Sequence, residues 1–144
     1  MSRTRRQDTR PAALQPLSAA AKLRLVAEIL GTYALVRWRM RDSDIRVVVG
    51  HTRRGGSAER HSDRPVALRL ARAVGRTLRV LPADDRCLAR SLVLDALLAR
   101  RGLESVLVIA ARAEPAFAAH AWVEHDGIPV LPAGAAGYER LVSL

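Results

Sequence analysis

The sequence predicts an α+β fold, in which helices come first and a cysteine-bearing helix then packs on a small antiparallel sheet. Three observations lead to this prediction. Apolar residues recur at helical spacing over long stretches before Gly102. After Gly102 the apolar period changes to two, which is typical of strands. Within that second part, Asp126-Gly127 is the kind of pair that closes a two-residue β-hairpin.

Composition and charge agree with an ordinary globular domain. The chain has 144 residues, of which 49% are apolar, so it can bury a core of its own. Its net charge of +10 would suit an acidic partner, but basic charge alone specifies none, and solvated arginines are the simpler explanation. Aromatic residues make up only 3%, which gives no stacking platform for nucleic acid. We therefore expect no nucleic-acid partner.

The cysteine usage and the N-terminus predict the compartment. Cys87 is the only cysteine, so no intrachain disulfide can form, which fits a reducing environment. The first residues lack the apolar region and the cleavage site of a signal peptide. The sequence contains no run of about 18 uncharged apolar residues, so it predicts no membrane span. We therefore expect a cytoplasmic protein with no membrane partner.

The chain divides into an arm and one domain. Residues 1–16 are basic, polar and interrupted by proline, and predict a disordered arm. Residues 17–144 predict a single domain, with a helical part over residues 17–81 and a catalytic core over residues 82–144.

The helical part contains two helices and a short strand by sequence pattern. Ser18 is the expected N-cap of a helix from about Ala19 to about Met40. The β-branched run Ile45–Val49 predicts a strand, and residues 51–63, with two adjacent glycines, predict a loop. Pro65 opens the next helix. One face of that helix carries a row of arginines, which we interpret as a solvated face rather than an anion-binding surface: Arg69, Arg72, Arg76 and Arg79.

The catalytic core begins after Leu81-Pro82 ends that helix. Asp84 and Asp85 predict the cap of a further helix, which runs from near Cys87 to about Arg101 and ends at Gly102. Strands are then expected at residues 105–112, 117–125 and 128–131, and the tail from Pro132 is expected to be irregular.

Cys87 is the first candidate for chemistry. In the first turn of a helix, free backbone N–H groups and the positive end of the helix dipole stabilise a thiolate and make the sulfur nucleophilic. The structural alternative is a small buried thiol, which is the usual role of a lone cysteine.

His120 strengthens the catalytic interpretation of Cys87. It lies in an apolar strand segment, where a titratable ring needs a partner or a function. A cysteine at a helix start, followed by a histidine on an antiparallel strand, is an arrangement used for thiol nucleophiles. His51 and His61 lie in the polar loop, and His125 faces the other side of the strand. No metal-ligand spacing is present, so we expect neither a metal nor another cofactor.

The group that would orient the His120 ring stays open. A count across the expected turn brings the region of Pro132–Ala133 opposite His120, and that region has no acidic or amide side chain. Glu124 shares the His120 face about 13 Å away, and we prefer it to Asp126, which the turn already explains. A backbone carbonyl, or a Cys–His dyad without a third group, is equally admissible. Trp122 shares the same face and would either wall the site or fill the core.

Two segments carry a family resemblance: CLARSLVLDALLARRG around Cys87 and AHAWVEHDGIPV around His120. Together with LSAAAKLRLVAEIL near the N-terminus, they make residues 17–131 resemble the leader peptidases of lasso-peptide (microcin-type) biosynthesis, within the transglutaminase-like cysteine-protease superfamily. The resemblance implies a transglutaminase or papain-like core. In that family the third catalytic residue is usually an Asp at about the position of Pro132, where this sequence departs from the pattern.

The resemblance also implies a function and partners. It implies a cysteine endopeptidase that removes the leader from a ribosomally made precursor, with Cys87 as nucleophile and His120 as base. The expected partners are the precursor peptide, a separate precursor-recognition protein and an asparagine-synthetase-like cyclase that uses ATP. The Cys87 backbone N–H would contribute to an oxyanion hole, and the second donor is unassigned because neither glutamine, Gln7 or Gln15, is obviously placed. The alternative is a catalytically impaired scaffold that binds the precursor or its recognition partner.

Overall fold

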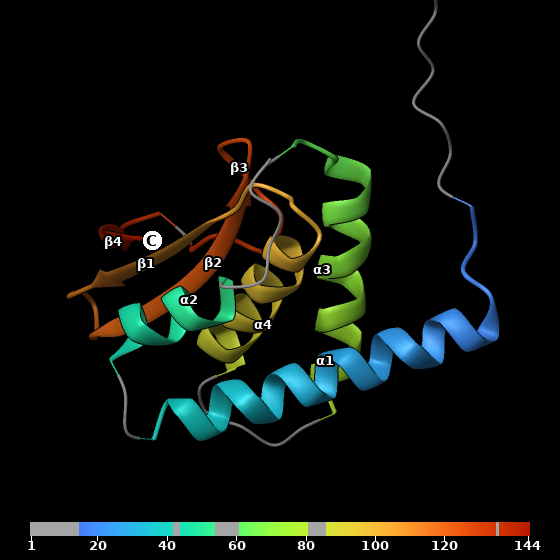
Figure 1. Cartoon of the computed structure of the whole chain (residues 1–144). Coiled ribbons are helices and arrows are strands. Elements are labelled where there is room, and N and C mark those ends of the chain that lie inside the picture. The colour runs from blue at the N-terminus through green and yellow to red at the C-terminus, as the bar shows by residue number, and fades with distance from the viewer. Residues whose placement is uncertain (1–14, 42–43, 54–60, 81–85, 135) are drawn as a thin grey trace, which may run out of the picture.

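The computed structural model describes residues 15–41, 44–53, 61–80, 86–134 and 136–144. Within these ranges helices precede strands, as the α+β prediction requires (Figure 1). The helices are α1 (Ala19–Arg39), α2 (Ile45–Arg53), α3 (Arg64–Leu78) and α4 (Arg86–Arg100). The strands are β1 (Val106–Arg112), β2 (Ala118–His125), β3 (Ile128–Pro129) and β4 (Glu139–Ser143). None of these helices holds a stretch that is long and apolar enough to cross a bilayer.

The starts of α1 and α3 follow from their capping residues. The Ser18 hydroxyl accepts a hydrogen bond from the Ala21 N–H at 3.2 Å. The Asp63 carboxylate does the same for the Val66 N–H at 3.1 Å, and Pro65 occupies the first turn of α3. Both caps satisfy a backbone donor that has no partner within its helix, which fixes where each helix begins. The predicted helix starts are therefore confirmed.

The expected strand at Ile45–Val49 is wrong, because these residues form the first half of α2. The Asp44 carboxylate accepts the Arg46 N–H at 2.8 Å and caps the helix. β-Branched residues lower helix propensity only slightly. Burial of Val48 and Val49 in the main core outweighs that preference. The helix runs on to Arg53, so the loop expected from residue 51 starts later; residues 54–60 lie outside the described ranges.

Helix α4 is the centre of the molecule, since it packs against α1, α2, α3 and the sheet. Its apolar residues join residues of the other three helices, of β1 and of β2 in one core cluster. Gly102, at φ 68°, ends the helix in the left-handed conformation, as the sequence predicts. A helix buried on several sides holds its N-terminal residues, Cys87 among them, in a fixed position.

A buried ion pair fastens α2 to α4. The Asp95 side chain is 0% exposed and accepts hydrogen bonds from Arg53 Nε at 2.9 Å and Arg53 Nη2 at 2.6 Å. The Ser105 hydroxyl donates to the same carboxylate at 2.7 Å. Arg53 Nη2 also donates to the carbonyls of Ser105 and Leu144, so one guanidinium links α2, α4 and the sheet. Removing one partner of such a pair typically costs about 3–5 kcal/mol.

The sheet is antiparallel, with strand order β3-β2-β1-β4. Asp126 and Gly127 both have positive φ, 53° and 70°, as a two-residue hairpin turn of the favoured kind requires. Glu124 lies opposite Pro129, which is the register that the turn predicts. The expected irregular tail is wrong in part, because β4 pairs with the free edge of β1. A strand of five residues after a Pro- and Gly-containing stretch carries too little periodicity to be seen in the sequence.

The two faces of the sheet have different surroundings. Leu107 and Val123 belong to the main core together with the residues of α4. On the other face, Val108, Ala110 and Trp122 form a small separate cluster, which Leu131 and Tyr138 help to cover. Because side chains alternate along a strand, His120 shares this second face with Trp122.

Candidate active site

Cys87 is the second residue of α4 and is partly exposed. The first backbone N–H groups of a helix have no carbonyl acceptor within the helix, and the sulfur of Cys87 lies at this end of α4, where the helix dipole is positive. This is the position that the sequence predicts for a nucleophilic thiol. Asp84 and Asp85, expected as helix caps, lie outside the described residues.

Cys87 and His120 lie toward the same end of α4 and β2 but on different sides of the sheet. The helix α4 packs on the face of Leu107 and Val123, whereas the His120 side chain is on the other face, and no hydrogen bond joins the two side chains in the part of the chain that the structure describes. β1 starts beyond the end of α4 and runs back along it, so β2, antiparallel to β1, runs in the direction of α4 (Figure 1). At the other end, His125, the last residue of β2, donates a hydrogen bond from Nδ1 to the carbonyl of Glu104, which lies in the segment between α4 and β1. From there, His120 is about 17 Å back along the strand, and Cys87 is about 22 Å back along the helix from Gly102.

The imidazole of His120 is oriented by a backbone carbonyl. Its Nε2 lies 2.9 Å from the carbonyl oxygen of Pro132. A carbonyl can only accept a hydrogen bond, so Nε2 carries the proton and Nδ1 of the neutral ring keeps its lone pair. The cross-strand count pointed to this position in the chain, although only the structure shows that the main chain supplies the contact.

Two aromatic rings contact the His120 ring. The ring centroids of His120 and Trp122 are 6.0 Å apart with an interplanar angle of 28°. Tyr138 lies at 6.0 Å on a tilted plane. Arg140 stands over the Trp122 ring at 5.8 Å, and Arg112 over the Tyr138 ring at 5.3 Å. Tyr138 and Arg112 were missed by sequence reasoning, because the tail was expected to be irregular and a single arginine at a strand end carries no signal.

Glu124, the preferred candidate for orienting His120, has other partners. It is 6% exposed, and its carboxylate accepts a hydrogen bond from Trp122 Nε1 at 3.0 Å and from Arg140 Nη2 at 2.6 Å. Within the described residues the hydrogen-bond partner of His120 is Pro132 rather than Glu124. Glu124 therefore acts on the site through Trp122, whose indole it anchors. Trp122 is 5% exposed and belongs to the small core cluster, and its ring also contacts His120. It therefore has both of the roles that the sequence left open.

Asp126 lies at the hairpin turn, beyond the opposite end of β2 from His120. Its backbone takes the left-handed conformation of the turn, and its carboxylate accepts a hydrogen bond from the Ser62 hydroxyl. It also stands 3.6 Å from Nε2 of His125. These contacts give Asp126 a structural role between the turn and the start of α3.

His125 uses both of its ring nitrogens in the fold. It is 1% exposed; its Nε2 accepts the Asp63 N–H at 3.1 Å, and its Nδ1 donates to the Glu104 carbonyl. No ring nitrogen is left for proton transfer. His61 is exposed and pairs through its backbone with Leu103, whereas the His51 side chain lies outside the described residues.

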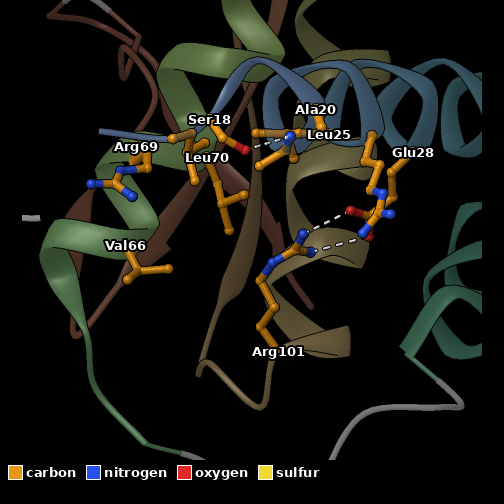
Figure 2. A pocket seen from close by; sticks show the side chains of 11 residues that line it. Ser18, Ala20, Leu25, Glu28, Val66, Arg69, Leu70 and Arg101 are labelled. Atoms are coloured by element: carbon orange, nitrogen blue, oxygen red, sulfur yellow. Dashed lines mark hydrogen bonds and ion pairs between the residues drawn. The ribbon is translucent and has the colours of Figure 1, made fainter. Parts of the chain in front are cut away.

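A groove of about 420 Å³ lies far from Cys87, where α1 and α3 meet the end of α4 (Figure 2). Arg101 pairs with Glu28 across it, with Nη2 2.7 Å from Oε2. The hydrogen bond and charge of Arg101 lower the pKa of Glu28 below its ordinary value despite partial burial. Arg69 donates to the Gln15 carbonyl at 2.9 Å, while the rest of the arginine row, Arg72, Arg76 and Arg79, is exposed. The groove is lined by no cysteine and no histidine, so it holds none of the candidate groups.

Comparison with known protein families shows which superfamily the chain belongs to. A family model described as transglutaminase-like superfamily matches residues 29–143. The chain belongs to the transglutaminase-like superfamily. The matched segment contains Cys87, His120 and Pro132, and the superfamily includes cysteine peptidases and transferases. Searches of curated proteins and of solved structures returned no match.

Proposed function

We propose that the chain is a cysteine endopeptidase that removes the leader from a ribosomally synthesised lasso-peptide precursor. The observation that carries the proposal is the hydrogen bond from His120 Nε2 to the Pro132 carbonyl, which leaves Nδ1 as a base. Cys87 at the same end of the molecule would be its nucleophile. Membership of the superfamily supports thiol chemistry, and the two motif segments support the leader-peptidase role.

The proposed reaction has two steps. Nδ1 of His120 takes the proton of the Cys87 thiol, and the resulting thiolate attacks the scissile carbonyl. The negative oxygen of the tetrahedral intermediate is stabilised by the Cys87 N–H. The C–N bond then breaks as His120 gives its proton to the leaving amine, and an acyl-enzyme remains. Water attacks this thioester while Nδ1 of His120 takes one of its protons, and the C–S bond breaks to give the carboxylic acid product and to restore the thiolate beside a protonated His120; the product then ionises in water. An amine in place of water would give a transferase product from the same intermediate.

The Pro132 carbonyl would replace the acidic residue of the family only in part. A carbonyl fixes the tautomer and the direction of the imidazole, as an Asp does. It carries no charge, however, so it stabilises a protonated imidazole less well. This difference is the specific observation that favours the second candidate, a scaffold that binds the precursor or its recognition partner without cleaving it.

The proposal includes the place of the reaction and its partners. A separate recognition protein would deliver the precursor, and an asparagine-synthetase-like cyclase would use the freed amine of the core peptide to close the ring. The lone reduced Cys87 supports a reducing compartment, so the reaction is proposed for the cytoplasm.

Mass spectrometry of the cognate precursor, incubated with the chain and the recognition protein, tests the proposal. We expect a free leader and a free core from the wild type and only intact precursor from Cys87→Ala. Arg72→Gln, an exposed change on α3, is the matched control and should cleave normally. Cleavage that persists in Cys87→Ala overturns the proposal. Precursor that binds the wild-type chain but stays intact supports the scaffold instead. A product mass that contains the added amine identifies transfer.

A further inference from the structure

Arg112 stands on the same face of the sheet as His120. It is the last residue of β1 and lies opposite Ala118, whereas Ala110 lies opposite His120. Residues separated by two along a strand share a face, so the Arg112 and His120 side chains are diagonal neighbours, with Cβ atoms roughly 7–8 Å apart. The end of β1 is also the end of the sheet toward the start of α4 (Figure 1).

The guanidinium of Arg112 is held in place without a counter-ion. Its central carbon lies 5.3 Å from the centre of the Tyr138 ring, and Tyr138 in turn contacts His120. Its Nε is buried and has no hydrogen-bond partner within the described ranges. In the part of the chain that the structure describes, no carboxylate pairs with Arg112, while Arg140 on the same face pairs with Glu124.

An unpaired, partly buried guanidinium is poised for an anion. The buried Nε is closed to an incoming acceptor, so an anion would bind through the two terminal nitrogens of the guanidinium. Arginine presents a planar fork that matches a carboxylate with two parallel hydrogen bonds. The contact with the Tyr138 ring restricts the guanidinium, so less rotamer freedom is lost when an anion binds.

We propose that Arg112 binds a carboxylate of the peptide substrate, the side chain of an Asp or Glu within two residues of the scissile bond. The inference rests on the proposed function, because it places that bond between Cys87 and His120. An extended peptide advances about 3.3–3.6 Å per residue, so roughly 7–8 Å from His120 corresponds to about two residues. Arg112 is thus a specificity-determining residue, and Tyr138 positions it.

A pair of alkylating reagents tests the inference without a known substrate. N-iodoacetyl-Asp-amide and N-iodoacetyl-Asn-amide react alike: the Cys87 sulfur displaces iodide and forms a thioether. They differ only in a carboxylate against a neutral amide. A second pair, with a Gly between the iodoacetyl group and the Asp or Asn, extends the reach by one residue. The measured quantity is the ratio of the alkylation rates of the Asp and Asn reagents, which cancels changes in the reactivity of the sulfur itself.

We expect the ratio of at least one pair to fall about 5–10-fold in Arg112→Gln, and Arg112→Lys to keep part of it, because a lysine retains the charge but not the fork. Arg72→Gln on α3 should leave the ratio at the wild-type value. A ratio that is equal in the wild type and Arg112→Gln for both pairs overturns the inference. Failure of the proposed function has a different signature. In that case Cys87 in the folded chain would be alkylated by the neutral Asn reagents no faster than Cys87 in the urea-unfolded chain.

Discussion

His120 and His125 lie on one strand, yet the fold gives them opposite roles. His125 faces the helices, is 1% exposed and has both ring nitrogens bonded to backbone groups. His120 faces the other side, is partly exposed and has one ring nitrogen bonded to the Pro132 carbonyl. The residue type and the strand are the same, and only the alternation of side chains separates the two. A histidine is available for chemistry when the fold leaves one of its nitrogens unused.

The same division applies to the two faces of the whole sheet. The face under α4 is closed by large aliphatic residues, with Leu107 and Val123 at 0% exposure. The other face carries rings and charges, with Trp122 and Tyr138 around His120 and with Arg112 and Arg140 outside them. Changes among the buried aliphatic residues of the first face should therefore affect stability, and changes around His120 on the second face should affect activity.

Replacing His120 should have the largest effect of the changes predicted here. If His120 is the general base, as proposed above, His120→Ala should lower kcat/KM for precursor cleavage by about 10²–10⁴-fold. The melting temperature should stay close to that of the wild type. The His120 ring is partly exposed, and within the described residues its hydrogen bond is the one to the Pro132 carbonyl. His61→Ala, at an exposed histidine, is the control for both measurements. If His120→Ala cleaved at the wild-type rate, the contrast between the two histidines would have no functional meaning.

Replacing His125 should have the opposite outcome. His125→Leu removes the ring partners of the Asp63 N–H and the Glu104 carbonyl, two part-buried hydrogen bonds, so we expect a loss of about 2–4 kcal/mol in the free energy of unfolding. The melting temperature should fall by roughly 5–15 °C. His125→Gln, which can keep one of the hydrogen bonds, should lose less. Urea and thermal unfolding give these values, and an unchanged midpoint in His125→Leu would remove the structural role.

The smallest effect is expected from the Glu28–Arg101 pair, which lies away from both faces of the sheet. Because the pKa of Glu28 is lowered by its hydrogen bond and charge contact with Arg101, the folded state prefers the ionised carboxylate. The stabilisation is present above the ordinary value of 4.5 and is lost as pH falls through the lower value of the folded state. We expect Glu28→Gln to cost about 0.5 kcal/mol at pH 7. Urea unfolding at pH 7 and pH 3 should show this difference shrinking at the acid end; a constant difference would contradict the assignment.

Much of the fold could be predicted from the sequence, and the misses have physical causes. The cap at Ser18, the helix start at Pro65, the glycine at 102 and the Asp126-Gly127 turn are local signals, and each is where a helix or hairpin begins or ends. The valines of α2 were misread because their burial against α4, a contact distant in sequence, overrides a weak local preference. β4 was missed because its partner is the edge of β1 and its own pattern is too short.

The site divides along the same line. Cys87 and His120 could be named from residue type and local position, and cross-strand counting reached Pro132. That the Pro132 carbonyl contacts His120, that Glu124 holds Trp122, and that Tyr138 and Arg112 join the ring stack required the three-dimensional structure. Main-chain contacts leave no signature in side-chain identity, and the sequence pattern does not show which residues a late edge strand brings across.

The sequence by itself determined an α+β chain with a cysteine at a helix start and a histidine on a following strand, because caps, turns and apolar periods act over a few residues. The tertiary structure decided which histidine has an unused nitrogen, which group orients it, and that Arg112 lies beside this histidine without a carboxylate partner among the described residues. These properties depend on contacts between segments far apart in the chain, and only packing brings such segments together.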